Sequence, residues 1–362
     1  MDQPYSVRTR TGQTHDVRLE NNAPMTRQPV RSAGRPTLDA VAARAGVGRG
    51  TASRVLNGSS QVSPQAKAAV EAAIVELGYV PNRAARSLVT QRTDSVALVV
   101  SESQERLFGE PFFAGVLRGI NSALMETPLQ LWLAMAASPE QRERVVNHLT
   151  GHHVDGVLLL SLHDEDPLPG ILRDRGMPFV LGGRPVDPHP EDFFVDVDNV
   201  SGARQAVEFL QANGASRIAT VAGPQDMEVG RGRLAGYRAA VRGGELIEVG
   251  DFSEEGGASA MRALLDREPG LDAVFAASDL MASGAMRALR DAGRLVPQDV
   301  QVVGFEDAPV ARQTQPPLTT VHQPVEDMGR RMAELLVSRI RREPVENSHV
   351  LLDTHLVRRG TA

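Results

Sequence analysis

The stretch AGVGRGTASRVLN, residues 45–57, decides how the N-terminal part of this chain folds. Gly46 supplies a tight turn after an alanine-rich segment, and the segment that follows carries Arg49 and Arg54 on one face with small residues between them. Two short helices joined by such a turn, with basic side chains exposed on the second, present side chains to the major groove of DNA. The stretch therefore predicts a helix-turn-helix module.

Residues 35–80 complete this module as an all-α DNA-binding domain. Thr37 can cap the first helix, the second helix runs to Asn57, and Ser63 followed by Pro64 opens the third. Each predicted helix has an apolar face at helical spacing. The three helices can therefore close a small core.

Charge separates this region from the rest of the chain. Residues 31–93 carry nine basic and three acidic side chains, a charge of +6, although the whole chain carries −6. A basic module joined to an acidic body is the charge distribution of a nucleic-acid binder whose body stays away from the phosphates. Charge alone leaves open the alternative of a merely basic surface.

The pattern changes at residue 94, where short apolar runs begin to alternate with helical segments. This alternation occurs in two blocks and predicts an α/β domain, residues 94–362, made of two doubly wound parallel-sheet lobes with a cleft between them. We assign the N-lobe to about 94–200 plus 321–343, and the C-lobe to about 201–318 plus 346–362. In this assignment, residues 350–356 form one strand.

Two segments fall outside these domains. Residues 1–34 are polar without periodicity and are expected to be a disordered extension. Residues 81–93 contain a helical candidate too short to be stable alone, which we interpret as a hinge helix and linker.

Composition excludes several classes of function. The absence of cysteine excludes disulfides, cysteine zinc sites and thiol catalysis. The apolar runs are too short to cross a bilayer and no apolar leader is visible, so we expect a cytoplasmic protein without a membrane partner. His148 and His152 are four residues apart but lack a third ligand in register, and no catalytic set or dinucleotide fingerprint is identifiable. We therefore expect no metal, no cofactor and no catalytic residues.

Seven short motifs, in order and at consistent spacing, give the chain a family resemblance. They are LDAVA (38–42), SRVLN (53–57), LGYVPN (77–82), ARSL (85–88), RLAGY (233–237), VVGFED (302–307) and PLTTV (317–321). The chain resembles the LacI/GalR family of bacterial transcriptional repressors. The resemblance implies lobes of periplasmic-binding-protein type and a homodimer that binds a palindromic DNA operator. It also implies that the dimer releases the operator, or binds it more tightly, when a small ligand enters the cleft.

The DNA contacts follow from the resemblance together with the chemistry of the residues. Arg49 and Arg54 can each fork onto a guanine, a contact that discriminates between bases by about 1–3 kcal/mol. Gly50 reads nothing directly, and a glycine there weakens the helix by about 1 kcal/mol. Hydroxyl and amide side chains are placed to bind phosphates. The complete set assigned to the DNA surface is Thr37, Arg49, Gly50, Thr51, Ser53, Arg54, Asn57, Ser63, Asn82, Arg83, Ala85 and Leu88.

Leu88 has a separate role in this interpretation. A leucine at the end of a polar, alanine-rich helix has little core to join. It can pack against the body or, as the resemblance implies, pair with its copy across a dimer and wedge into a central minor-groove step.

The resemblance also places a set of residues at the cleft. These are Phe112, Phe113, Ser161, Arg233, Phe252, Ser278, Asp279, Glu306 and Gln323. Arg233 and Glu306 are suited to fork the hydroxyl pairs of a sugar, and Phe252 can stack on a pyranose ring. Core packing is the alternative for the Phe112–Phe113 pair, and a helix cap is the alternative for Asp279.

The expected effector is a mono- or oligosaccharide such as a β-glucoside, and a purine or nucleoside co-repressor is the alternative. The polar loop at residues 161–166 can rim the cleft, and Trp132 is expected to be buried. Two rival classes share the doubly wound architecture. They are a sugar-binding protein without DNA function, which the basic N-terminal module argues against, and an enzyme, which no phosphate loop supports.

Overall fold

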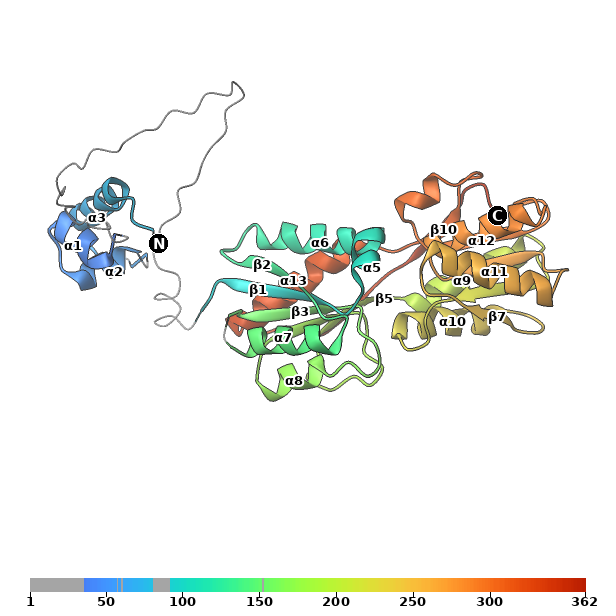
Figure 1. Cartoon of the computed structure of the whole chain (residues 1–362), viewed down its shortest axis with the longest axis horizontal. Coiled ribbons are helices and arrows are strands. Elements are labelled where there is room, and N and C mark those ends of the chain that lie inside the picture. Colours follow the sequence, from blue (N-terminus) through green and yellow to red (C-terminus); the bar gives the residue numbers. More distant parts are fainter. Residues whose placement is uncertain (1–35, 57, 60, 81–91, 152) are drawn as a thin grey trace, which may run out of the picture. The chain divides into compact units, whose positions relative to one another are not determined.

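The computed structural model describes residues 36–56, 58, 59, 61–80, 92–151 and 153–362 (Figure 1). The contacts divide the chain after residue 82 into two compact units, each treated separately below. The expected extension at residues 1–34 lies outside the described residues. So do five positions assigned to DNA, namely Asn57, Asn82, Arg83, Ala85 and Leu88.

The first unit contains the three predicted helices, α1 (Leu38–Ala45), α2 (Arg49–Leu56) and α3 (Pro64–Leu77). The Thr37 hydroxyl accepts from the Ala40 amide at 3.2 Å and the Ser63 hydroxyl accepts from Ala66 at 3.3 Å, so both predicted caps are confirmed. Gly46 ends α1 in the left-handed conformation, with φ of 66°, as the tight turn requires. The helices close over a core of Val41, Ala42, Ala52, Val70 and Ala73.

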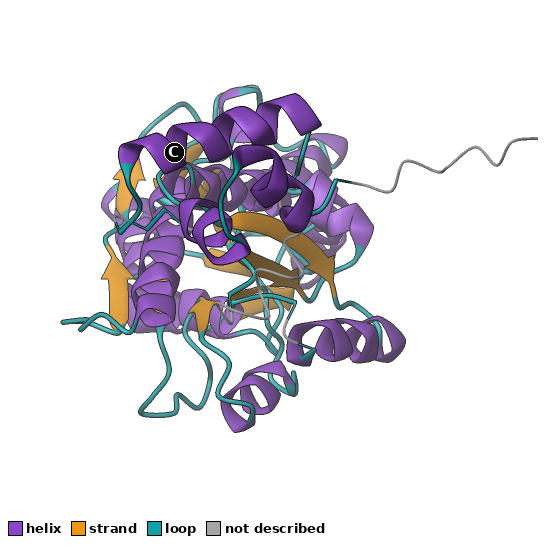
Figure 2. Ribbon diagram, turned by 90° about the vertical axis from the view of Figure 1, so that its left-hand side faces the viewer, coloured by secondary structure: helices purple, strands orange, loops and turns teal. Residues whose placement is uncertain are grey.

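The second unit holds two lobes, each built on one six-stranded sheet. In Figure 2, where the lobes overlap along the line of sight, helices lie above and below the twisted strands. The N-lobe sheet is parallel throughout. In spatial order it contains β11 (His349–Leu352), β5 (Phe194–Val197), β4 (Phe179–Gly182), β3 (Gly156–Leu160), β1 (Ser95–Val100) and β2 (Gln130–Met135). Its helices are α5 (Gln104–Gly109), α6 (Pro111–Leu124), α7 (Pro139–Thr150), α8 (Leu168–Asp174) and α13 (Val325–Arg341).

Alternation along β1 explains how this sheet is buried on both faces. Val96, Leu98 and Val100 pack against α6 and α13, which lie side by side in Figure 1. Ala97 and Val99 point to the other face, where residues of α7 and α8 cover them. A strand buried on both faces reads as a continuous apolar run, which is the signal that predicted it.

The C-lobe repeats this arrangement. Its sheet contains β12 (His355–Val357), β10 (Thr319–His322), β9 (Gln301–Glu306), β8 (Ala273–Ala276), β6 (Ile218–Ala222) and β7 (Leu246–Val249), with only β12 antiparallel to its neighbour. Its helices are α9 (Asn199–Ala212), α10 (Glu228–Ala240), α11 (Glu254–Arg267), α12 (Asp279–Asp291) and the short 3-10 helix η1 (Pro309–Arg312).

The predicted lobe boundaries in the last fifty residues are wrong in two places. Residues 321 and 322 belong to β10 of the C-lobe, and β11, assigned to the C-lobe, pairs with β5 of the N-lobe. The predicted single strand at 350–356 is two strands in different sheets. The polar pair Asp353-Thr354 separates the two strands, and the chain crosses there from the N-lobe to the C-lobe. The Thr354 hydroxyl donates to the carbonyl of Asp198 at 3.2 Å, where the chain also crosses between the lobes, from β5 to α9.

Three further features differ from expectation. The helix α5 and the strand β7 were not predicted, because both are short and carry little apolar periodicity. Trp132 was expected to be buried but is 55% exposed. It lies on β2, which is an edge strand and has no neighbour on its outer side within the described residues.

Candidate functional site

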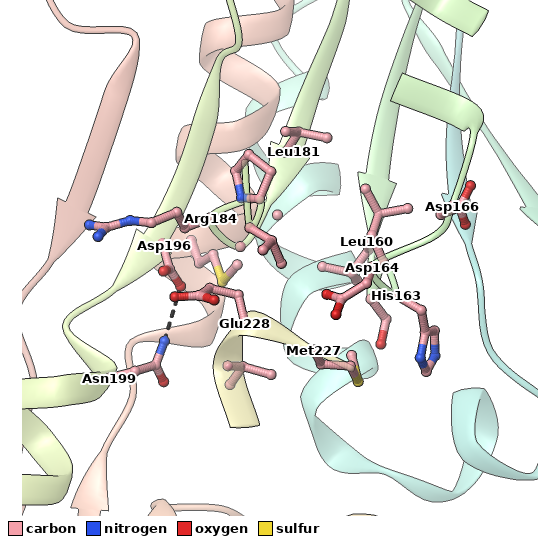
Figure 3. Close-up of a pocket in the computed structure, with 18 of the residues that line it drawn as sticks. Leu160, His163, Asp164, Asp166, Leu181, Arg184, Asp196, Asn199, Met227 and Glu228 are labelled. Atoms are coloured by element: carbon pink, nitrogen blue, oxygen red, sulfur yellow. Dashed lines mark hydrogen bonds between the residues drawn. The ribbon is translucent and has the colours of Figure 1, made fainter. Parts of the chain in front are cut away.

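A cavity of about 410 Å³ lies between the two lobes of the second unit and is lined by both (Figure 3). Its walls come from segments that follow the carboxyl ends of strands, where ligands bind in doubly wound sheets. Phe112, Phe113, Ser161, Arg233, Phe252, Glu306 and Gln323 line it, as the sequence predicted. The size and the mixture of apolar walls with a few convergent polar groups suit a small organic ligand.

Arg233 of α10 is the most constrained polar group of the C-lobe wall. It is 1% exposed, and its guanidinium lies 3.9 Å over the ring of Phe305. Its Nε donates to Asn199 Oδ1 at 2.9 Å and its Nη2 donates to Gln323 Oε1 at 2.9 Å. The guanidinium is therefore fixed by α9 and by the segment after β10 before any ligand arrives.

Glu306 stands beside this guanidinium at the end of β9. Its Oε1 is 3.4 Å from Arg233 Nη1, which also donates to the Ala277 carbonyl at 2.5 Å. Burial raises the pKa of Glu306 from its ordinary value of 4.5 to about 7, against the opposing effect of Arg233. An arginine and a carboxylate side by side can donate to and accept from adjacent hydroxyls.

This raised pKa makes the stability of the protein depend on pH. Because the folded pKa is higher than the unfolded one, the group contributes stability below about pH 4.5 that is lost as pH rises to about 7. We expect the free energy of unfolding of the parent, relative to Glu306→Gln, to fall across this range. Urea denaturation at intervals from about pH 5 to pH 8 measures the difference, and parallel curves for the two proteins would contradict the prediction.

Asp196 and Asn199 extend the polar floor of the cavity and were missed as site residues. Figure 3 shows them side by side, with Asn199 Nδ2 donating to Asp196 Oδ1 at 3.2 Å. Burial raises the pKa of Asp196. Nothing in the sequence indicated that Asn199 holds Arg233.

The N-lobe wall begins at the end of β1. Arg106 of α5 donates from Nε to Glu110 Oε1 and from Nη1 to Glu102 Oε1, both at 2.7 Å. The Ser161 hydroxyl, at the end of β3, donates to the same Glu102 at 2.6 Å. Arg106 and Glu110 line the cavity and were also missed, because they belong to the unpredicted helix and its C-terminal end.

Phe112, Phe113 and Phe252 supply apolar wall. Phe113 is 1% exposed and packs into the N-lobe core, with the ring of Phe112 edge-on at 5.3 Å. Phe252 is 6% exposed, and the guanidinium of Arg106 lies over its ring at 5.6 Å. Phe252, on which a pyranose was expected to stack, therefore has an arginine of the opposite lobe near its ring.

The loop at residues 161–166 lines the cavity and bridges the lobes, which confirms its predicted place at the rim. Asp164 accepts both Nη groups of Arg231 at 2.7 and 2.5 Å, and its amide donates to the Asp226 carbonyl at 2.9 Å. His163 Nδ1 lies 2.7 Å from Asp226 Oδ2. The carboxylate of Glu102, 3.6 Å from Nε2, and then that of Asp226 raise the pKa of His163 to about 9 against the opposing effect of burial, so the imidazole is charged near neutral pH.

Two predicted cleft residues do not line the cavity. The hydroxyl of Ser278 caps α12 by accepting from Met281 at 3.2 Å. Asp279, fully buried, accepts from the Ala308 amide at 2.7 Å and from the Thr320 hydroxyl at 2.5 Å. Both side chains are therefore used within the C-lobe and do not line the cavity, and the helix cap that was the alternative for Asp279 is made by Ser278.

The outer face of α2 in the first unit carries the predicted DNA-reading residues. The side chain of Arg49 is 72% exposed, 3.6 Å from Asp39 Oδ1, and Arg54 is also exposed. A Cβ built on Gly50 would meet only Arg54 Nη2, at 3.7 Å. Thr37 and Ser63 are exposed at helix N-termini, and Thr51 and Ser53 are half-buried on α2.

The open space at Gly50 predicts the effect of adding a methyl group there. Gly50→Ala is accommodated without a clash and removes the conformational entropy cost of a helical glycine. We expect α2 to be stabilised by about 0.5–1 kcal/mol. Slower amide hydrogen exchange of α2 in the full-length variant is the measurement, and unchanged or faster exchange would contradict the prediction.

Comparison with known proteins identifies the family to which this chain belongs. Residues 37–82 match the profile "Bacterial regulatory proteins, lacI family", and residues 207–362 match "Periplasmic binding protein-like domain". Over 330 residues the chain is 56% identical to the HTH-type transcriptional regulator CelR of Thermobifida fusca, covering 89% of this chain and 97% of that protein. The chain belongs to the LacI family. It is a DNA-binding transcriptional regulator, and the predicted fold class is confirmed.

Other LacI-family proteins match over most of the chain. The ribose operon repressor of Escherichia coli K12 is 36% identical, covering 90% of this chain and 99% of that protein. A structure titled as the complex of the regulator CelR with cellobiose is 54% identical, with a TM-score of 0.73, covering 91% of this chain and all of that one. The lac repressor dimer bound to operator is 29% identical, with a TM-score of 0.78, covering 90% and 98%.

The structure adds one observation on membranes. None of the helices in the described part of this LacI-family chain has the length and apolar character that a membrane crossing requires.

Proposed function

We propose that this LacI-family regulator represses genes of carbohydrate uptake or catabolism. It binds a palindromic operator as a homodimer and leaves it when a neutral β-linked glucose disaccharide of the cellobiose type occupies the interlobe cavity. It acts in the cytoplasm, and its function needs no catalytic step and no cofactor.

The charge of the cavity wall carries this proposal. Among the described residues, eight carboxyl groups line the cavity, against four guanidinium groups and the charged imidazole of His163. An excess of carboxylates disfavours phosphorylated or acidic ligands, whereas carboxylates and guanidinium groups together accept from and donate to many hydroxyls. A neutral polyhydroxyl compound fits this wall better than a nucleotide or a sugar phosphate.

The volume and the relatives support the same class of ligand. A cavity of about 410 Å³ falls in the range that holds small organic ligands, about 300–1,000 Å³. The CelR structure, which is 54% identical over 91% of this chain, is described as a cellobiose complex. The ribose operon repressor is more distant at 36% identity, so a disaccharide is preferred to a pentose.

The exposed edge of the N-lobe sheet supports a homodimer. Trp132 is 55% exposed and Leu133 is 42% exposed, both on the edge strand β2. Large apolar side chains on an unpaired edge are a surface that proteins normally cover. A two-fold dimer also presents two reading helices to the two half-sites of a palindrome, and the lac repressor was solved as a dimer on its operator.

At the DNA, we assign base contacts to Arg49 and Arg54. Thr37, Thr51, Ser53 and Ser63 of the described residues are assigned to phosphates, which fix the position of the domain without reading the sequence. The basic charge of residues 31–93 supports this division of roles.

The test begins by selecting an operator for the full-length protein from a pool of randomised duplex DNA. Fluorescence anisotropy on the selected duplex then follows release by cellobiose, cellotriose, ribose, glucose 6-phosphate and cytidine. We expect cellobiose to release the protein at the lowest concentration and glucose 6-phosphate to have no effect. A selected sequence without two-fold symmetry, or release by cytidine alone, would overturn the proposal.

A further inference from the structure

We propose that Arg106 and Glu110 form a second hydroxyl-binding pair of the cavity, supplied by the N-lobe. It acts together with the Arg233–Glu306 pair of the C-lobe, so that each lobe holds the sugar through one arginine and one carboxylate. The inference rests on the proposed sugar effector and assigns how the two lobes share it.

The geometry of Arg106 is that of a preorganised donor. Two carboxylates, one buried and one half-buried, hold it, because Nη1 donates to Glu102 and Nε donates to Glu110, both at 2.7 Å. The side chain of Glu102 is 5% exposed and that of Glu110 is 13% exposed. Nη2 makes no hydrogen bond with the residues that the structure describes, and Arg106 lines the cavity. A guanidinium fixed on two sides with one free amino group can donate to a ligand at little entropic cost.

Glu110 supplies the matching acceptor. It lies at the junction of α5 and α6, where its Oε1 accepts from Arg106 and the carboxyl group lines the cavity. Burial raises the pKa of Glu110, although Arg106 opposes the rise. A carboxylate that has lost water in this way gains from accepting a sugar hydroxyl.

The pair faces the C-lobe across the cavity. The Arg106 guanidinium lies 5.6 Å over the ring of Phe252, whose other neighbours include the guanidinium of Arg233 at 6.0 Å. Burial and Arg233 have the largest effects on the pKa of Glu306, and the charges of Glu110 and Arg106 also reach it. The two arginine–carboxylate pairs are therefore close enough to contact one ligand.

The arrangement differs from an ordinary surface ion pair. Arg118 and Glu326 form such a pair on the same lobe, with Arg118 Nε donating to Glu326 Oε1 at 2.7 Å. Their side chains are 63% and 61% exposed, and neither lines the cavity. The Arg118–Glu326 pair offers a matched control, because it has the same residue types and the same 2.7 Å separation as Arg106 and Glu110 but lies outside the cavity.

The experiment is calorimetric titration of the full-length protein and its variants Arg106→Met, Glu110→Gln and Arg118→Met with cellobiose and its monodeoxy analogues. We expect Arg106→Met to weaken cellobiose binding by about tenfold or more, and Arg118→Met to change it by less than about twofold. The parent should bind cellobiose more tightly than at least one of the monodeoxy analogues. Arg106→Met should bind cellobiose and that analogue with equal affinity. Thermal melting checks the fold, and Glu110→Gln, which keeps the size of the side chain, carries the test if Arg106→Met does not fold.

Three results would overturn the inference, and they are distinguishable. Equal or tighter cellobiose binding by both cavity variants would show that the guanidinium only competes with the sugar for Phe252, and the proposed function would stand. Weaker binding with unchanged discrimination of every analogue would reduce the pair to a positioning role. Absence of cellobiose binding by the parent would overturn the proposed function, and the inference with it.

Discussion

Replacing Arg233 with methionine is expected to leave the repressor on its operator at sugar concentrations that release the parent. Arg233 is 1% exposed, and its guanidinium donates to Asn199, Gln323 and the Ala277 carbonyl. The four hydrogen bonds that Arg233 makes leave one N–H of Nη2 for a ligand. A hydrogen bond that involves a charged group contributes about 1.5–3 kcal/mol, so losing this one weakens ligand binding by about 10–100-fold. Fluorescence anisotropy with increasing cellobiose measures the release.

The control for this variant lies on the same helix. Arg238 is 51% exposed and pairs with Glu245 at 3.0 Å, so Arg238→Met removes a similar side chain away from the cavity. It should be released like the parent. Operator affinity in the absence of sugar should be close to normal in both variants, because the first unit is unchanged. Release of Arg233→Met at the parental sugar concentration would remove this residue from the ligand site.

Removing both arginines from the outer face of α2 should have a comparably large effect on operator binding. Each bidentate contact with a guanine discriminates by about 1–3 kcal/mol, so Arg49→Ala and Arg54→Ala should each weaken specific binding by about 10–100-fold. The double variant should lose about a thousandfold if the two contacts are independent. Both side chains are exposed and outside the core, so the fold of the domain should be unaffected.

A comparison with non-specific DNA distinguishes contacts to the bases from contacts to the phosphates. The selected operator and a scrambled duplex are compared by anisotropy at one salt concentration, since phosphate contacts depend strongly on salt. Lys67→Ala on α3 removes a cation that lies 3.8 Å from Glu71 and should lower affinity for both duplexes slightly and equally. Equal losses on both duplexes for the arginine variants would assign these side chains to the phosphate backbone instead.

The first unit was predictable because its signals are local. Thr37, Gly46 and Ser63 act on backbone groups within four residues of themselves, so their roles follow from position in the sequence. Strands buried on both faces were equally visible as continuous apolar runs. The failure at Asp353-Thr354 has a different cause, because the choice of sheet depends on partners far away in the sequence.

The cavity was predictable only in part. The family resemblance placed Glu306, at the end of β9, and Arg233, on α10, at the cleft, and both line the cavity. It also placed Asp279 there, but the carboxylate of Asp279 is directed into the C-lobe. The resemblance does not reveal that Thr320 and Ala308 already use this carboxylate. Arg106 was missed because it lies on α5, several residues after the end of β1, and sequence periodicity does not reveal this short helix.

The bridge between the 161–166 loop and the start of α10 has a kinetic consequence. The contacts of Asp164 with the Arg231 guanidinium and with the Asp226 carbonyl join the lobes beside the cavity. Separation of the lobes breaks these contacts, and we expect it to limit how fast a ligand can enter. The observed association rate should then rise with sugar concentration only to a plateau, set by spontaneous opening. The response time of the regulator would thus be a property of the protein, independent of how abruptly the sugar appears.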